Sequence, residues 1–366
     1  MGMRVLRNND KGRQLTDRAV QGMAVSAIIL SVLLLAAACG TDTGSGEDGA
    51  GQGVRKAPTY VVWVESIPTG LDEGTIVLHY TDLDSGTDTE LASDDEYGFH
   101  QPAVSGRVVV WVDEREDGRI FARDLVTGRE RSVSDDHGIK PAVSGQWVVW
   151  ELGKKLEGEW YYLIVAHNLA SGVERTVELP EKPVSMVPTF SVSGDWLVWN
   201  RSIDVDQHWR DLNEIWGMRL STGEQTLLRP KGTYYGPAVA GEWVLWRRSD
   251  SNRVEALDLR TRKVRLLPKG ATTVTDGERV ITVKGGQAAA QAGRSRMFVY
   301  DLRRRRLTPV PVAPGRFGSL GIHGEWVMWR EPRGSLAPAP LRAVNYVTGE
   351  TMTVADDAMD PSISRD

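Results

Sequence analysis

The stretch PAVSGQWVVW at residues 141–150 has close copies at 102–111 (PAVSGRVVVW) and at 237–246 (PAVAGEWVLW). Looser copies raise the number of these anchors to seven, and every anchor but one ends at a Trp. The end residues are Trp63, Trp111, Trp150, Trp199, Trp246, Thr282 and Trp329. Their mean spacing is about 44 residues, and a period of roughly 40 to 45 residues is typical of propeller blades. We expect the Trp residues inside the anchors to form the core.

One repeat predicts four antiparallel strands, here called A to D. In residues 101–134 the extended PAVS is followed by a Gly turn, the strand VVVWV, a polar turn, the strand RIFARDL, a VTG turn and the alternating segment RERSVS. β-Branched and aromatic residues favour buried strands, and alternation favours an edge strand. Because this pattern recurs, the sequence predicts an all-β fold of four-stranded blades.

The turn between strands C and D repeats in step with the anchors. Its copies are DLDSG at 82, DLVTG at 124, NLASG at 168, RLSTG at 219, DLRTR at 258, DLRRR at 301 and NYVTG at 345. Five copies end in Gly, which readily adopts positive φ. Arg262 and Arg305 replace it in the other two, and we expect those two turns to be looser.

The two ends of the repeat region predict ring closure. The first repeat lacks strand A, whereas the last residues, DPSISRD from Asp360, resemble a strand A with nothing after it. A C-terminal strand that completes the first blade leaves no unpaired seam, which argues against an open solenoid. The expected fold is a closed seven-bladed β-propeller at 59–366. Its blades are expected at about 59–100 plus 359–366, 101–139, 140–186, 187–235, 236–271, 272–317 and 318–358.

The repeats resemble the TolB-like, WD40-like β-propeller repeat, in which Pro-x-x-Ser precedes a Gly turn and a later strand ends at Asp-Leu before another Gly turn. The resemblance covers residues 60–366 and implies the fold, together with a tendency to bind partners or ligands on a loop face. TolB itself differs in having six blades, an added N-terminal domain and no lipid anchor. Its partnership with a peptidoglycan-associated lipoprotein is therefore not transferred to this chain.

The N-terminal segment predicts a bacterial lipoprotein. Residues 1–38 combine a basic start with the apolar run MAVSAIILSVLLLAAA, which at 16 residues is shorter than the roughly 20 that span a bilayer. LAAAC resembles a lipobox, so Cys39, the single cysteine, is the expected site of lipid (palmitate) attachment. An uncleaved signal anchor is the alternative. Residues 39–58, rich in Gly, Ser and acid, are expected to form a flexible tether. Both alternatives place the propeller outside the cytoplasm, at the cell membrane.

Charge is distributed unevenly along the chain. The net charge is −5, yet residues 229–306 contain 18 Lys and Arg against 7 Asp and Glu. Two C–D turns supply a candidate membrane-facing basic patch, for which a solvated rim is the alternative. Nucleic acid is not an expected partner outside the cell. The patch residues are Arg260, Arg262, Lys263, Arg265, Arg303, Arg304, Arg305 and Arg306.

The opposite loop face is acidic and aromatic, and it is the expected partner or ligand face. Its candidate residues are His100, His137, Tyr97, Trp209, Tyr234 and Tyr235. Carboxylates with His can hold a divalent cation, and the weak candidates are Asp94, Asp136 and Asp357. Asp is also a preferred turn residue, so plain turns are the simpler interpretation, and no metal or other cofactor is expected.

Catalytic motifs are absent from the sequence: it has no Gly-x-Ser-x-Gly elbow, no His-Glu-x-x-His and no phosphate-binding loop. We therefore expect a non-enzymatic, monomeric module that binds a protein or a cell-envelope ligand. The alternative is a metal-dependent lyase or hydrolase that uses the His and Asp residues at the channel mouth.

Overall fold

The β-branched and aromatic segments of the repeats form strands, and the polar Gly-containing segments between them form turns. A computed structural model describes residues 58–68, 74–95, 98–156, 159–178, 189–205, 211–285, 292–331 and 339–365, all within one compact unit, Leu33–Asp366. The predicted signal, Cys39, the predicted tether, Tyr97 and Trp209 lie outside the described residues. None of the described residues form a helix long and apolar enough to span a bilayer.

Five sheets contain four antiparallel strands each, in the spatial order A to D that the repeat predicts. The first consists of β4 (Phe99–Ser105), β5 (Val108–Asp113), β6 (Arg119–Asp124) and β7 (Glu130–Ser132), with a 3-10 turn, η1 (Glu114–Glu116), between β5 and β6. The second consists of β8 (Gly138–Ser144), β9 (Trp147–Leu156), β10 (Glu159–Asn168) and β11 (Glu174–Glu178). The third consists of β12 (Phe190–Ser193), β13 (Trp196–Val205), β14 (Asp211–Arg219) and β15 (Gln225–Gly232).

The other two four-stranded sheets follow the same order. One consists of β16 (Tyr234–Ala240), β17 (Trp243–Arg248), β18 (Val254–Asp258) and β19 (Val264–Leu266). The next consists of β20 (Ala271–Thr275), β21 (Arg279–Lys284), β22 (Arg296–Asp301) and β23 (Leu307–Pro309). Strand β5 is buried at every residue, whereas β7 is exposed at every residue, as expected for a buried B strand and an edge D strand.

The last sheet joins the two ends of the repeat region. It has seven strands, in the order β24-β25-β26-β27-β1-β2-β3. Their bounds are β24 (Gly318–His323), β25 (Trp326–Arg330), β26 (Ala339–Asn345), β27 (Thr351–Arg365), β1 (Thr59–Pro68), β2 (Gly74–Asp82) and β3 (Thr87–Asp94). The first part of β27 pairs with β26, and its last part pairs antiparallel with β1. The expected pairing of the C-terminal segment with the strand that contains Trp63 is thus present.

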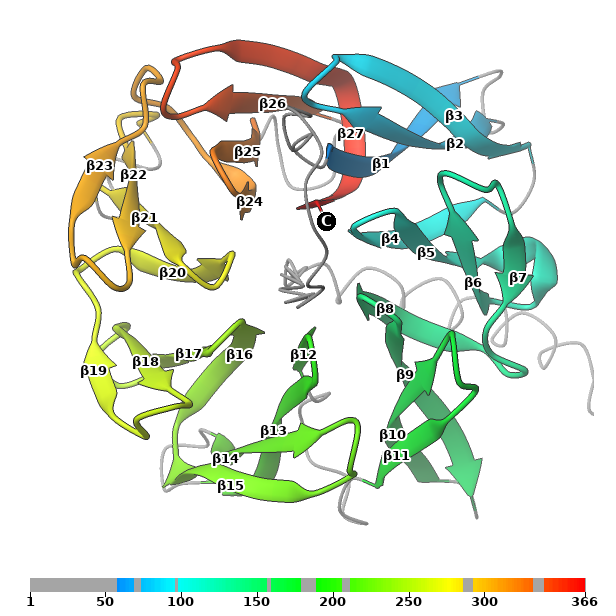
Figure 1. Cartoon of the computed structure of the whole chain (residues 1–366), viewed down its shortest axis with the longest axis horizontal. Helices are drawn as coiled ribbons and strands as arrows, with labels where there is room; N and C mark the ends of the chain where they lie inside the picture. Colours follow the sequence, from blue (N-terminus) through cyan, green and yellow to red (C-terminus); the bar gives the residue numbers. More distant parts are fainter. Residues whose placement is uncertain are drawn as a thin grey trace, which may run out of the picture. The chain divides into compact units, whose positions relative to one another are not determined.

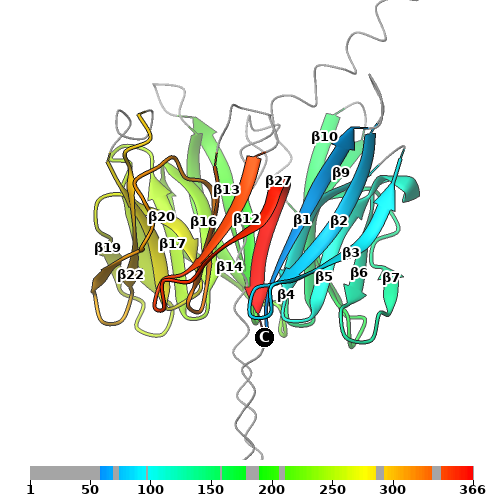
Figure 2. The same ribbon diagram turned by 90° about the horizontal axis from the view of Figure 1, so that it is seen from above.

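The sheets stand around a common centre, with β4, β8, β12, β16, β20 and β24 nearest to it (Figure 1). Within each four-stranded sheet the strands progress outward from this innermost strand. In the seven-stranded sheet the end of β27 also lies near the centre, beside β4. The end of β27, marked C in Figure 2, lies at the edge of the unit where the C–D turns also lie. We call this edge the turn face and the opposite edge, which carries the B–C and D–A connections, the loop face.

Trp residues pack between adjacent sheets, as the sequence predicts. Trp111 is fully buried in a cluster that joins β1 and β2 to β4 and β5, and Trp150 is buried in the next interface along the chain. Of the ten anchor Trp residues, eight are buried, whereas Trp147 and Trp196 are partly buried. Burial of such large side chains stabilises the contacts between blades.

The Ser-Gly step of the anchor also links neighbouring sheets. The hydroxyl of Ser144 accepts a hydrogen bond of 2.8 Å from the N–H of Gly194 in the next sheet. The same bond joins Ser105 to Gly145 at 3.1 Å and Ser193 to Gly241 at 3.0 Å. Three copies of the motif thus make the same contact with the copy that follows.

Candidate binding surfaces

The seven C–D turns share one backbone conformation. The last residue of each turn has φ between 58° and 82°, and its N–H donates to the carbonyl four residues earlier at 2.7 to 2.9 Å. Arg262 and Arg305 have φ of 58° and make this bond at 2.8 and 2.9 Å. The expectation that these two turns are looser is therefore wrong. Both arginines adopt the left-handed conformation that the glycines adopt elsewhere.

Three arginines on D strands link neighbouring sheets at the turn face. Each lies three residues after the left-handed position and donates to a carbonyl in the C–D turn of the following sheet. The pairs are Arg131 with Leu169, Arg175 with Ser221 and Arg265 with Leu302. Arg265 also stacks over Trp243, with 4.2 Å between the guanidinium carbon and the ring centroid. Burial lowers the pKa of Arg265, so this residue differs from the exposed patch predicted around it.

The other predicted patch residues are exposed. Two of them have acidic neighbours: Arg304 pairs with Asp301 at 3.1 Å, and Arg303 approaches Glu242 at 3.7 Å. Within the described part of the chain, no carboxylate pairs with the remaining five, which we call the free cations. They are Arg260, Arg262, Lys263, Arg305 and Arg306.

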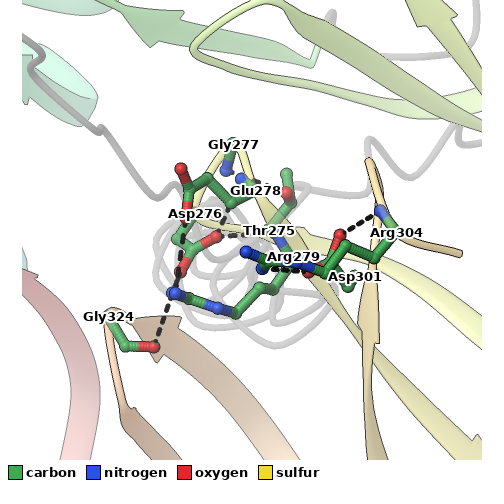
Figure 3. Close-up of polar contacts among 8 residues, drawn as sticks. All are labelled: Thr275, Asp276, Gly277, Glu278, Arg279, Asp301, Arg304 and Gly324. Atoms are coloured by element: carbon green, nitrogen blue, oxygen red, sulfur yellow. Dashed lines mark hydrogen bonds and ion pairs between the residues drawn. The ribbon is translucent and has the colours of Figure 1, made fainter. Parts of the chain in front are cut away.

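The sixth anchor replaces the Ser-Gly contact with an ion pair (Figure 3). The Arg279 guanidinium lies 2.9 Å from the Asp276 carboxylate and also donates to the carbonyl of Gly324 in the next sheet at 2.8 Å. Burial raises the pKa of Asp276, and Arg279 only partly offsets this effect. The contact between sheets is thus kept where Asp276 stands in place of the anchor Ser.

The predicted partner residues of the loop face are dispersed. His100 and His137 are exposed, and His137, which directly precedes β8, lies against Gly118, which directly precedes β6 of the preceding sheet. Tyr235 is half-buried. Tyr234, by contrast, is only 7% exposed and packs edge-on against Trp246. Tyr234 is therefore a core residue and does not present its ring to a partner.

The residues proposed as weak metal ligands make local contacts or are exposed. Asp94 accepts a bond of 3.2 Å from the N–H of Gly98, and the carbonyl of Asp136 accepts a bond from Ser134. Asp357 is exposed. Among the described residues, no group of three or more His, Cys, Asp or Glu side chains lies close enough together to hold a metal ion.

A feature that the sequence did not reveal lies on the innermost strands. Five of these strands carry a β-bulge, in which two residues face a single anchor Trp on strand B. The first residue of each bulge has φ between 39° and 55°. These residues are Gln101, Lys140, Gly236, Ser319 and Asp360. Four of the five carry polar side chains, which we call the bulge set: Gln101, Lys140, Ser319 and Asp360.

Two members of the bulge set are held by hydrogen bonds. The Gln101 side-chain oxygen accepts a 2.5 Å bond from the N–H of Lys140 in the next sheet. The Lys140 ammonium lies 2.9 Å from the carboxylate of Glu151, which has no exposed surface. Burial raises the pKa of Glu151, and Lys140 opposes this rise. The other Glu151 oxygen, Oε1, has no hydrogen-bond partner among the described residues.

Solved structures with a similar fold confirm the architecture. A β-propeller domain of the Trilobed protease from Pyrococcus furiosus aligns with 81% of this chain and 92% of its own length, at 16% identity and a TM-score of 0.58. The fold is a β-propeller. TolB from Acinetobacter baumannii aligns with 84% of this propeller chain and 67% of its own, at 14% identity and a TM-score of 0.47.

Enzymes are also among the similar structures. Acylaminoacyl peptidase from Pyrococcus horikoshii aligns at 15% identity and a TM-score of 0.60. The alignment covers 81% of this chain but 51% of the peptidase, so the propeller chain spans about half the length of that enzyme. Identities this low carry over the fold alone. No protein-family model matches the chain, and no curated protein matches it.

Proposed function

We propose that this protein is a membrane-anchored, extracytoplasmic lipoprotein whose propeller is a non-enzymatic binding module. The observation that carries the binding role is the bulge set. Figure 1 shows that the innermost strands surround the centre of the unit, so the bulge set lies on the strands nearest to that centre. Four neighbouring inner strands, β24, β27, β4 and β8, supply the four polar residues.

The fold does not require polar side chains at these four positions. A bulge with a left-handed first residue accommodates the anchor Trp opposite it, and Gly236 meets that need without strain. Gln101, Lys140, Ser319 and Asp360 adopt the same conformation at a backbone cost that glycine avoids. Because strain of this kind is retained at binding sites, we infer that their side chains contact a ligand or partner.

The chemistry of the bulge set indicates the kind of partner. It offers a carboxylate, an amide, a hydroxyl and an ammonium group, which together accept and donate hydrogen bonds over a short arc. A polar segment of a cell-envelope protein or ligand matches such a surface better than an apolar one. Gln101 and Lys140 are fixed by each other and by Glu151, so part of the surface is organised before binding.

We further infer a monomeric ring of seven blades closed by β27. The double pairing of β27 with β26 and β1 supports the closure, and the seven C–D turns of one conformation support the blade number.

A photo-crosslinking amino acid tests the binding role in full-length protein in the membranes of producing cells. Placed at Ser319, it is expected to give discrete adducts, whereas placed at Thr127 on the turn face it is expected to give none. A Gln101→Gly/Asp360→Gly variant keeps the bulges and should lose the Ser319 adducts without a lower melting temperature. Equal adducts at Ser319 and Thr127, or none at Ser319, would contradict the proposal.

Lipid attachment at Cys39 is tested separately. A Cys39→Ser variant should accumulate as an uncleaved precursor and should no longer incorporate a palmitate analogue, because the thiol is the only acceptor. The wild-type chain labelled in parallel is the control. Labelling that persists in the variant would refute attachment at this residue.

A further inference from the structure

The point where the chain enters the propeller fixes which face lies toward its N-terminal segment. Strand β1 begins at Thr59, whose N–H donates to Asp84 at 2.9 Å and whose carbonyl accepts from Leu83 at 2.8 Å. Leu83 and Asp84 belong to a C–D turn. The chain therefore enters at the turn face, the face that also carries the free cations.

We propose that the turn face around Arg262 and Arg305 docks on an anionic lipid surface and orients the propeller on the membrane. The inference rests on the proposed lipid anchor at Cys39. Between Cys39 and Thr59 lie 19 residues, which span at most about 65 Å when fully extended. The anchor thus keeps the entry point, on the turn face, within about 65 Å of the lipid headgroups.

The free cations are not required by the fold. Arg131, Arg175 and Arg265 show how the structure uses an arginine at this face, since each bonds a carbonyl of the following sheet. In the described part of the chain, no carboxylate pairs with Arg262 or Arg305. Both occupy a left-handed position that glycine occupies in the other five turns. Strained backbone that carries an unneeded charge indicates a role outside the fold.

The two cationic turns lie next to each other and form one surface. Arg265, at the base of one turn, donates to the carbonyl of Leu302 in the other. Arg303, in the second turn, approaches Glu242 of the sheet that carries the first turn at 3.7 Å. Five free cations are therefore presented together. Each cation near an anionic membrane strengthens adsorption by roughly fivefold, so the set can orient a body that is already tethered.

This orientation leaves the loop face accessible to a partner. The first residues of the bulges lie toward the loop-face ends of the inner strands, because each strand runs from the loop face to its A–B turn. With the turn face on the lipid, the loop-face mouth points away from the membrane. The inference therefore assigns a membrane side and a partner side to the same propeller.

The test uses full-length, lipidated protein in vesicles of phosphatidylcholine, with or without phosphatidylglycerol. A fluorophore is attached through Thr261→Cys on the turn face or Ser251→Cys on the loop face of the same sheet, and spin-labelled headgroups quench it. We expect severalfold stronger quenching at residue 261 when phosphatidylglycerol is present, and added salt should reverse it. Residue 251 should show no dependence on lipid composition.

Matched charge variants identify the cause. Arg260→Ser/Arg262→Gly/Arg305→Gly/Arg306→Ser should abolish the dependence on phosphatidylglycerol, and the two glycines suit the turn conformation. The control, Lys269→Ser/Lys284→Ser/Arg294→Ser/Arg296→Ser, removes four exposed cations from the loop-face side and should leave the dependence intact. Equal losses in both variants, or no dependence in the wild type, would overturn the proposal.

The anchor and the docking face are scored independently. Incorporation of a palmitate analogue into the same preparations reports the anchor, so an unlabelled protein overturns the proposed lipidation itself. A labelled protein without lipid-dependent quenching at residue 261 overturns only the docking face. Heparin that changes the fluorescence at 261 equally in both vesicle types, with no effect of lipid composition, would assign the cations to a soluble polyanion instead.

Discussion

Arg262 and Arg305 adopt a left-handed backbone conformation that is unfavourable for residues with a side chain. An L-residue other than glycine in the left-handed region costs about 1 kcal/mol or slightly more. Arg262→Gly and Arg305→Gly should therefore each raise the free energy of unfolding by up to about 1 kcal/mol, less the entropy that glycine adds to the unfolded chain. Urea titration measures the change. Thr261→Gly, within the same turn, should destabilise, and stabilisation by that control would remove the backbone explanation.

The hydroxyl of Ser144 has a role that its neighbours in the anchor lack. It bonds Gly194 of the next sheet at 2.8 Å while only 1% exposed. Ser144→Ala should lower the free energy of unfolding by about 1 kcal/mol, because the hydrogen bond from the N–H of Gly194 is lost. Ser251→Ala, at an exposed position, should have no measurable effect. Equal stability of Ser144→Ala and wild type in chemical denaturation would contradict a stabilising role for this bond.

At the residue scale the sequence predicts burial better than contacts. The Trp residues were assigned to the core from the repeat alone, and most are buried. The sequence places Tyr234 on the partner face, whereas in the structure its ring packs on Trp246. A Tyr in a polar segment gives no signal of which side of the strand its ring occupies. The Lys140–Glu151 pair joins strands β8 and β9 at the bulge. No pattern in the sequence predicts this bulge, so the pair could not be predicted either.

Among the elements, the C–D turns couple folding to pH. Asp124, Asp258 and Asp301 begin three of these turns; burial acts to raise each pKa, but hydrogen bonds from turn N–H groups outweigh it and the pKa values are lowered. A carboxyl with a depressed pKa in the folded state stabilises above its unfolded value and loses that contribution as the pH falls. The melting temperature should therefore drop from about pH 5 downward.

Asn is the natural control for these turns. Asn168 and Asn345 hold the same position, and their side-chain oxygens accept the same turn N–H bonds. Asp124→Asn/Asp258→Asn/Asp301→Asn should thus fold normally and show a smaller melting shift between neutral and acid pH. If the pH profile is unchanged in the triple variant, other carboxyls control the acid response.

Strands and turns follow from the sequence because alternation and glycine are local signals. The buried B strand, the exposed D strand and the positive φ at the turn ends are all present. The bulges were missed because they arise where an inner strand accommodates a Trp of its neighbour. That requirement depends on the paired strand, and it leaves only a residue before Pro or a small residue as its trace.

For the molecule as a whole, β27 is the element on which both ends depend. Deleting residues 359–366 removes the partner of β1 and exposes the site of Ile363, which has no exposed surface. Lost burial and unpaired backbone groups cost about 1 to 3 kcal/mol each, which is large against a total of about 5 to 15 kcal/mol. Calorimetry should show a clearly lower melting temperature. Melting within a degree of the full-length chain would refute this role for β27.

The double pairing of β27 also dictates the order of assembly. Strand β1 is among the first folded segments to leave the ribosome, but its partner is the last, nearly 300 residues later. Contacts between such distant segments form slowly because a very long loop must close first. The first sheet therefore remains incomplete throughout synthesis, and a chain that is released early lacks its final strand. For the exported protein that we propose, this late closure favours passage through a narrow translocation pore before the ring is complete.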